Sequence, residues 1–304
     1  MSWRIGLIGL GKIAQDKHLP ALAANPAFEL AAVVDPHAPA LAGVPGFTDH
    51  RAMLDALPDL DAVAICTPPG PRHSIARDCL LAGKQVLLEK PPTATLSELV
   101  DLERLAAARG RVLYATWHSR HAPAIEEARR RLAGQGVRRL RITWKEDVRR
   151  WHPGQQWIWQ PGGFGVFDPG INALSIATRI MPTPLFVRRA ELHFPANRDT
   201  PIAADLDLGE GFEAVFDWRQ TGDQIWEIEA DTDAFRLKLA KGGGRLEVDG
   251  EPIIDAPRDE YAAIYRRFDE LLRSGASDVD ADPLRLVADA FMIGRRIPVE
   301  RFED

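Results

Sequence analysis

The most constraining feature of this chain is the stretch 4–14, RIGLIGLGKIA, which predicts a buried strand, a tight turn and the start of a helix. Gly9, Gly11 and Ala14 form a GxGxxA pattern within it. In such a pattern the first glycine permits the turn, the second lets the backbone approach a pyrophosphate, and the small third residue lets helix and strand pack closely. The phosphates would lie at the helix N-terminus, where unpaired N–H groups and the helix dipole favour negative charge.

A glycine turn alone is a weak signal, because many α/β folds that bind no nucleotide contain one. Here a second apolar strand, 28–34, ends at Asp35, whose carboxylate is placed to accept hydrogen bonds from the ribose hydroxyls of adenosine. Together, the glycine turn and Asp35 predict a dinucleotide site. The alternative is a structural turn followed by a solvated aspartate. The Asp35 carboxylate would repel the 2′-phosphate of NADP, although Pro36 and His37 lie at positions that could contact this phosphate. We therefore expect NAD as cofactor, with NADP tolerated.

Length and charge narrow the class of protein. The 304 residues are enough for two domains, each with its own core. A net charge of −6 argues against nucleic acid as the main partner, so the basic cluster 129–150 is interpreted as a solvated face. Two cysteines, Cys66 and Cys79, are too few for a disulfide framework or a zinc site. Without an apolar run of 18 residues or a signal-peptide pattern, we expect a cytoplasmic protein with no membrane partner.

Alternating patterns in the first part of the chain predict a parallel, doubly wound sheet. The further strands are expected at 61–66, 85–88 and 112–116. The helices between them are expected at 51–57, 72–82 and from Thr95 or Ser97 to 108. This gives a first domain over residues 1–119.

The pattern changes near His118, and residues 120–304 are expected to form a second, α+β domain on a mostly antiparallel sheet. After a hinge helix at 123–132, strands are expected at 137–144, 185–193, 212–218, 224–229, 234–239 and 245–248. The short connections 220–223 and 241–244 suit hairpins. One helix should begin near Asp168, and two more, 258–273 and 283–295, close the chain and are free to pack back on the first domain.

Lys90 is the first candidate for chemistry. It follows a buried strand at its carboxyl end, where open α/β sheets place their ligands. Pro91 and Pro92 behind it restrict the backbone and prevent a helix from continuing. The alternative is an ordinary surface charge at a strand end.

The run 162–174, GGFGVFDPGINAL, holds the second candidate. Asp168 and Asn172 are four residues apart, so on a helix both side chains lie on one face. The glycines before them would keep the approach of a ligand free of bulk. An equally good interpretation is structural: Asp168 as an N-cap with Pro169 at the first helical position.

A third candidate is the group of tryptophans at 144, 151, 157 and 159, which places half of the eight tryptophans within 16 residues. Flat aromatic faces pack against the C–H faces of a sugar ring, and the nearby Glu146 and His152 would bond to its hydroxyls. His152 alone is more typical of a structural histidine. His118 and His121 lack further ligands at metal spacing, so no metal is expected, and no GxSxG elbow supports a hydrolase.

Four segments together resemble the glucose-fructose oxidoreductase, inositol dehydrogenase and rhizopine-catabolism protein family, Gfo/Idh/MocA. They are GLGKIA near the N-terminus, AICTPP at 64–69, EKPP at 89–92 and GGFGVFDPGIN at 162–172. The resemblance covers essentially the whole chain, and EKP is its most specific part. It implies a nicotinamide-dependent oxidoreductase with an N-terminal Rossmann domain and a C-terminal domain built on a large open sheet. The outer face of that sheet often mediates oligomerisation in the family, so a homodimer or higher homo-oligomer is expected.

Within the family the stretch 145–163 is most similar to bacterial aldose 1-dehydrogenases acting on L-arabinose and D-galactose. That similarity implies a sugar site and a cofactor site. The sugar site would comprise Lys90, Glu146, Trp151, His152, Asp168 and Asn172. The cofactor site would comprise Gly9, Gly11, Lys12, Ile13, Asp35, His37, Thr67, Pro68, Glu89 and Lys90.

One departure from the family matters for the mechanism. The wider family commonly has a histidine base four residues after the aspartate, where this chain has Asn172, which cannot act as a base. Because the ring oxygen makes the anomeric hydroxyl of an aldose more acidic than an ordinary alcohol, Asp168 would suffice as proton acceptor, with Lys90 donating a hydrogen bond to the C1 oxygen. The roles of proton acceptor and hydrogen-bond donor could also be exchanged between Asp168 and Lys90. The competing interpretations are a non-catalytic nucleotide-sensing regulator and a family enzyme with another polyol or diol substrate.

Overall fold

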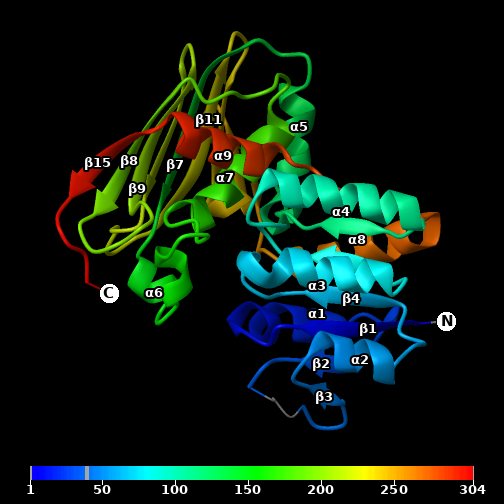
Figure 1. Cartoon of the computed structure of the whole chain (residues 1–304). Coiled ribbons are helices and arrows are strands. Elements are labelled where there is room, and N and C mark those ends of the chain that lie inside the picture. Colours follow the sequence, from blue (N-terminus) through cyan, green and yellow to red (C-terminus); the bar gives the residue numbers. More distant parts are fainter. Residues whose placement is uncertain (1, 38–40, 304) are drawn as a thin grey trace. The chain divides into compact units, whose positions relative to one another are not determined.

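The computed structural model describes residues 2–37 and 41–303. These form two compact units, shown with their elements labelled in Figure 1. The first unit comprises the described residues up to His118 together with Asp259–Ala281. The second comprises Ser119–Arg258 and the described residues from Asp282 onward.

The first unit contains a six-stranded parallel sheet in the order β3-β2-β1-β4-β5-β6, the order of doubly wound dinucleotide-binding folds. Its strands are β1 (Trp3–Ile8), β2 (Phe28–Val34), β3 (Gly46–Phe47), β4 (Ala62–Ile65), β5 (Gln85–Leu88) and β6 (Leu113–Ala115). The Rossmann prediction is confirmed. Only β3 was not expected, because two residues carry no periodic pattern and pairing with β2 alone makes them a strand.

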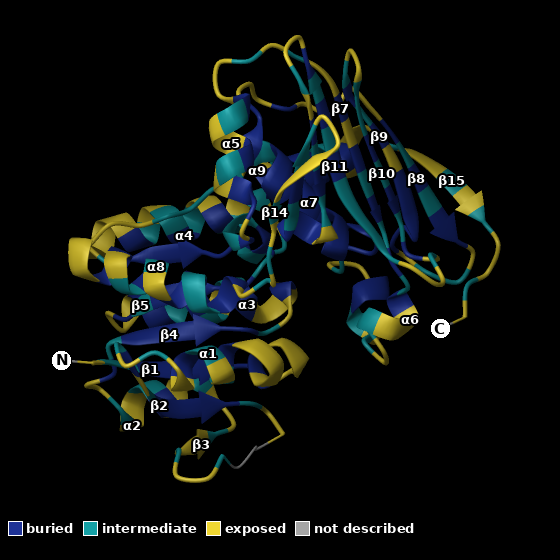
Figure 2. Cartoon of the chain, turned by 180° about the vertical axis from the view of Figure 1, so that it is seen from behind, coloured by how far each residue is buried: buried dark blue, intermediate teal, exposed yellow. Residues whose placement is uncertain are grey.

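Helices cover both faces of this sheet, and the strands between them are largely buried, except for the short edge strand β3 (Figure 2). Successive strand residues point to opposite faces, so Ile5 and Leu7 share a core with α1 (Leu19–Ala23) and α8 (Glu260–Ser274). Ile8 shares the other core with α2 (His50–Ala56), α3 (Pro69–Leu81) and α4 (Leu96–Arg109). No helix in the described part of the chain is long and apolar enough to span a bilayer.

The second unit contains a nine-stranded sheet in the order β14-β13-β12-β11-β7-β10-β9-β8-β15. Its strands are β7 (Val137–Lys145), β8 (Arg189–Pro195), β9 (Ala203–Gly209), β10 (Phe212–Asp217), β11 (Ile225–Thr232), β12 (Arg236–Ala240), β13 (Arg245–Val248), β14 (Glu251–Asp255) and β15 (Arg295–Val299). Its helices are α5 (Ile125–Leu132), α6 (Val148–Trp151), α7 (Phe167–Ile180) and α9 (Asp282–Ile293). Two pairs, β7 with β10 and β8 with β15, are parallel and the others antiparallel, which confirms a mostly antiparallel sheet.

Several details of this sheet correct the sequence predictions. β9, β14 and β15 were not expected, and the last predicted helix ends at Ile293 rather than residue 295. The connection 220–223 is not a hairpin, because β10 and β11 lie on opposite sides of β7. The connection 241–244 does join antiparallel neighbours, β12 and β13. The strand β15 and the separation of β10 from β11 depend on pairing between strands far apart in sequence, which local pattern does not carry.

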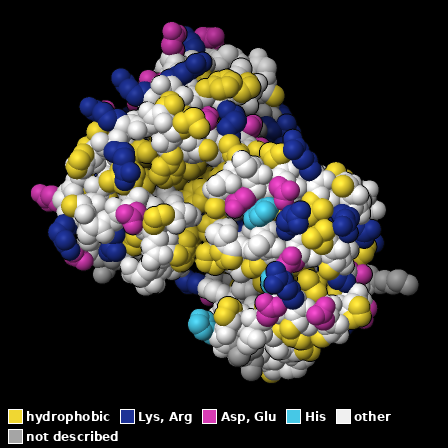
Figure 3. Space-filling model, in the orientation of Figure 1, with side chains coloured by type: hydrophobic (Ala, Val, Ile, Leu, Met, Phe, Trp, Pro, Cys, Tyr) yellow, Lys and Arg dark blue, Asp and Glu magenta, His cyan; other side chains and the backbone are white. Residues whose placement is uncertain are grey.

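The basic cluster 129–150 is largely ion-paired. Arg130 and Arg131 bond to Glu127 within α5 at 2.7 Å, and Arg141 on β7 pairs with Glu213 on β10 at 3.2 Å. On the face shown in Figure 3, Lys and Arg side chains are interspersed with Asp and Glu. The cluster therefore belongs to a mixed-charge, solvated surface.

Candidate functional site

The glycine turn after β1 has the geometry that its sequence pattern predicts. Gly9 has a φ of +91°, and a Cβ there would lie 2.8 Å from the backbone nitrogen of Thr67, so only glycine fits. A Cβ on Gly11 would meet nothing within 4 Å. Ala14 is completely buried against the sheet. The turn thus leaves open space beside Gly11, at the start of the helix, which fits a dinucleotide pyrophosphate.

Asp35 connects the end of β2 to this turn. One carboxylate oxygen accepts the Leu10 N–H at 2.9 Å and the other accepts the His37 N–H at 3.0 Å. Each oxygen keeps a further lone pair for a ribose hydroxyl. Four other residues expected to contact the cofactor have exposed side chains: Lys12, Ile13, His37 and Pro68.

Lys90 follows β5 directly and is half-buried. Its backbone N–H donates to its neighbour, the Glu89 carboxylate, at 2.7 Å. The buried guanidinium of Arg72 donates to the backbone carbonyls of Thr67, Glu89 and Pro91. The peptide segment that carries Lys90 is therefore held on both sides of the lysine.

Glu89 is buried with His18, Tyr261 and Tyr265 in the first unit, a group that we call the Glu89 cluster. One Glu89 oxygen accepts the Tyr261 hydroxyl at 2.7 Å and lies 3.1 Å from His18 Nε2, and His18 Nδ1 is 2.7 Å from the Tyr265 hydroxyl. Contact between Glu89 and a cofactor stays a prediction. None of the other three residues was singled out from the sequence, because they lie 71 to 176 positions from Glu89 and no local signal links them.

These contacts make Glu89 and His18 an ion pair. Burial alone would raise the pKa of Glu89, but the hydrogen bond and charge of His18, the charge of His118 and the Tyr261 hydroxyl hold it well below its usual range. Burial alone would lower the pKa of His18, but Cys66, Tyr265 and Glu89 raise it well above 6.5. Burial, with smaller contributions from nearby groups, raises the pKa of Tyr265 to about 12 and that of Tyr261 well above its ordinary value.

The second unit brings together Glu146, His152 and Asp168. Glu146 follows β7, His152 follows α6, and Asp168 lies in the first turn of α7. His152 Nε2 is 3.6 Å from an Asp168 oxygen and 3.7 Å from a Glu146 oxygen. Both carboxylates are only 5% exposed, whereas His152 is half-buried. Since these separations exceed hydrogen-bond length, the three side chains converge on a common region without closing on one another.

Trp226 on β11 completes this polar group, although the sequence prediction missed it. Its indole N–H donates to the second Glu146 oxygen at 2.9 Å. The ring centroids of Trp151 and Trp226 are 5.4 Å apart. Trp226 stands outside the tryptophan-rich stretch and is brought to it by the register of β11 against β7, which places it opposite Trp144.

The four tryptophans of that stretch do not form one aromatic surface. Trp144 and Trp159 are buried core residues, exposed by 4% and 3%. Trp159 packs against Trp218, at 5.2 Å between ring centroids, and Trp151 is half-buried. Core filling therefore accounts for part of the cluster, against the sequence interpretation. Trp144 and Trp151 both lie beside Trp226, and of these two Trp151 is the half-buried one.

The run 162–174 also differs from its sequence interpretation. The N-cap of α7 is Val166, and Asp168 is the second helical residue, so the N-cap alternative for Asp168 is wrong. A Cβ at Gly163 or Gly165 would lie 2.4 Å from a backbone carbonyl oxygen, so these glycines permit close packing of the chain rather than access for a ligand. Asn172, one helical turn after Asp168, is half-buried.

Comparisons with known proteins agree with this architecture. The model of an oxidoreductase family with an NAD-binding Rossmann fold, GFO_IDH_MocA, matches residues 3–116. The chain is 46% identical to galactose 1-dehydrogenase of Pseudomonas fluorescens over 308 residues, which cover 99% of each protein. The structure superposes on D-galactose-1-dehydrogenase from Rhizobium etli with a TM-score of 0.95 and 52% identity, covering 100% of this chain and 99% of that one.

A more distant structure shares the fold alone. KijD10, a 3-ketoreductase from Actinomadura kijaniata solved with NADP and TDP-benzene, has a TM-score of 0.84 at 22% identity and covers 98% of this chain and 100% of its own.

The parallel sheet, its glycine turn and the second, mixed sheet define a two-unit, dinucleotide-dependent oxidoreductase. With a relative 46% identical over its whole length, the chain belongs to the Gfo/Idh/MocA family, and its first unit is the NAD-binding Rossmann domain. The family resemblance found in the sequence is thereby confirmed.

Proposed function

We propose that this chain is an aldose 1-dehydrogenase that oxidises C1 of D-galactose and L-arabinose to the lactone with NAD or NADP. The observation that carries the proposal is the 46% and 52% identity, over essentially whole chains, to two galactose 1-dehydrogenases. D-Galactose and L-arabinose share the configuration at C2, C3 and C4 and differ only by the C5 hydroxymethyl group. A site that reads those three hydroxyls therefore accepts both sugars.

The residues of the second unit suit a sugar. Glu146 and Asp168 are acceptors, and His152 between them donates or accepts, so the group matches several hydroxyls on one ring. Trp226 holds Glu146 by its indole N–H, and with Trp151 it offers an apolar surface for C–H groups. We assign the binding of ring hydroxyls to Glu146 and His152.

In the proposed reaction, C1 loses a hydride and the hydroxyl oxygen on C1 loses a proton. The bound nicotinamide accepts the hydride from C1. Asp168 takes the proton of the anomeric hydroxyl, Lys90 donates a hydrogen bond to the C1 oxygen as its bond order rises, and Asn172 holds that hydroxyl in place. The products are the lactone and the reduced cofactor.

The test is a panel of aldoses with each cofactor, followed by the absorbance of the reduced nicotinamide. We expect turnover with D-galactose and L-arabinose, and kcat/KM lower by about tenfold or more for D-glucose, whose C4 hydroxyl is inverted. Because Asp35 disfavours a 2′-phosphate, kcat/KM should be higher with NAD than with NADP. No reduction with any aldose would favour the regulator or another polyol substrate, and a strong NADP preference would contradict the role of Asp35.

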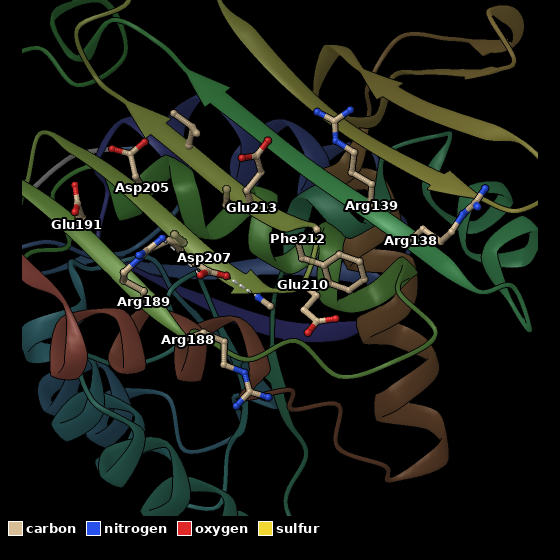
Figure 4. A pocket seen from close by; sticks show the side chains of 15 residues that line it. Arg138, Arg139, Arg188, Arg189, Glu191, Asp205, Asp207, Glu210, Phe212 and Glu213 are labelled. Atoms are coloured by element: carbon tan, nitrogen blue, oxygen red, sulfur yellow. Dashed lines mark hydrogen bonds and ion pairs between the residues drawn. The ribbon is translucent and has the colours of Figure 1, made fainter.

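We also propose that the chain forms a homodimer through the outer face of the nine-stranded sheet. This face has a hollow, shown in Figure 4. Positively and negatively charged side chains of β7, β8, β9 and β10 line it, together with Arg188 just before β8. Its charged residues include Arg188, Arg189, Glu191, Asp205 and Asp207, and the Arg189 guanidinium lies 3.8 Å from the Asp207 carboxylate. A surface with both signs side by side suits contact with a second copy of itself.

Light scattering should therefore give twice the mass of the chain. Replacing Arg188 and Arg189 together by Glu should shift the protein to monomer, because it leaves the carboxylates of the partner copy facing negative charge. Arg104→Glu, an exposed change on α4 in the first unit, should not. A monomeric wild-type protein at micromolar concentration refutes the dimer.

A further inference from the structure

The Glu89 cluster lies in the core of the first unit, where polar side chains are costly unless hydrogen-bonded. His18 and Tyr265 are 0% exposed, Glu89 2% and Tyr261 5%. The mechanism proposed above uses none of these four side chains. A core of this size could be filled by apolar residues, so a fully engaged ion pair here needs an explanation.

The Glu89 cluster is hydrogen-bonded to the peptide group of Lys90, the residue to which we assign a role in the reaction. One Glu89 oxygen is held by Tyr261 and His18, and the other accepts the Lys90 N–H at 2.7 Å. On the opposite side, Arg72 binds the carbonyls of Glu89 and Pro91. A displacement of the Glu89 carboxylate would therefore move the backbone from which the Lys90 side chain extends.

Each partner of Glu89 comes from a different structural element. His18 ends the π-helical turn η1 (Ala14–His18), in which the Leu19 N–H bonds to the Ala14 carbonyl. Such wider turns occur often at functional sites. Tyr261 comes from α8, more than 170 residues after Glu89. The two elements fix the carboxylate from two directions, as a group that must hold a fixed orientation requires.

We propose that Glu89, held by His18 and Tyr261, is a positioning residue that sets the location of Lys90 relative to the substrate carbon. This inference rests on the proposed function of Lys90 as donor to the C1 oxygen. Because a misplacement of about 1 Å can cost about 100-fold in rate, an anchor at the lysine backbone has a kinetic effect beyond its effect on stability.

Two tyrosines on α8 provide a matched pair of variants. Tyr261→Phe removes a hydroxyl bonded directly to Glu89, and Tyr265→Phe removes an equally buried hydroxyl that bonds only to His18. We expect Tyr261→Phe to lower kcat by about tenfold, with the KM for the sugar and the Kd for NAD nearly unchanged. Tyr265→Phe should lower Tm by a similar amount but leave kcat within about threefold of the wild type.

Amide hydrogen exchange supplies a readout that needs no cofactor or turnover. In the free protein, Tyr261→Phe should speed exchange in peptides that contain Lys90, because the acceptor of its N–H is then less firmly held. Tyr265→Phe should change this exchange less. Equal effects of the two variants on kcat, or unchanged kcat and exchange in both, would overturn the positioning role.

Lys90→Met separates this inference from the proposed function. If Lys90→Met turns over normally, the proposed role of Lys90 is wrong, and the positioning role falls with it. If Lys90→Met is inactive while Tyr261→Phe keeps wild-type kcat, only the positioning role is wrong. If Lys90→Met is inactive and Tyr261→Phe lowers kcat, both roles are supported. The variant that carries both substitutions should then have the same residual rate as Lys90→Met, because Tyr261 acts through the lysine.

Discussion

Asp168→Asn is expected to lower kcat by about 10²- to 10⁴-fold, the range of a lost general base. The change keeps the shape of the side chain and removes its ability to take the proton of the anomeric hydroxyl. Asp168 is 5% exposed, and its backbone N–H bonds to the Gly165 carbonyl at 2.8 Å, so the substitution should leave α7 in place. The Kd for NAD, measured in the absence of sugar, should not change, because Asp168 lies in the second unit.

The measurement is kcat with saturating D-galactose and NAD, alongside a binding titration. Asp223→Asn, an exposed change in the loop before β11, is the control and should match the wild type. Near-normal turnover of Asp168→Asn would end the assignment and leave Lys90 as the group to test as proton acceptor. A large rise in KM with normal kcat would make Asp168 a binding residue only.

Glu89→Ala is expected to destabilise the protein by about 3–5 kcal/mol, because it leaves His18 buried without its carboxylate partner. The contribution of the pair should depend on pH in both directions. Because folding lowers the pKa of Glu89, its charge stabilises the folded protein fully above pH 4.5, the ordinary pKa of a glutamate. This stabilisation is lost as the pH falls from 4.5 through the lowered pKa. Because folding raises the pKa of His18, its charge stabilises the folded protein fully below pH 6.5, the ordinary pKa of a histidine. This stabilisation is lost as the pH rises through the raised pKa.

The difference in Tm between the wild type and Glu89→Ala should therefore be largest between about pH 4.5 and 6.5 and should narrow on either side. Glu270→Ala is the control, since Glu270 lies on the same helix as Tyr261 but pairs with Arg267 at the surface, with 65% of its side chain exposed. Surface ion pairs contribute about 0–1 kcal/mol. A pH-independent difference would mean that the pair is not ionised in the folded protein.

The elements that could be predicted are those with local signals. The apolar run and Gly9 specify the first strand and turn, and Thr95 with Glu98 forms the capping box that begins α4. The EKP and DPGIN segments identify Lys90 and Asp168 as candidates by motif. Strands such as β15, RRIPV, carry no such signal: it contains a proline, follows α9 closely, and becomes a strand by pairing with β8.

By itself, then, the sequence determined the family and the Rossmann domain, and it named the candidate residues of the site, because strand period, turn residues and short motifs act within a few positions. Only the tertiary structure decided which side chains support them. Trp226 reaches Glu146 from 80 positions away and Tyr261 reaches Glu89 from 172, contacts that depend on strand register and helix packing. Such contacts form between distant segments when a common core is buried, and no local pattern of residues encodes them.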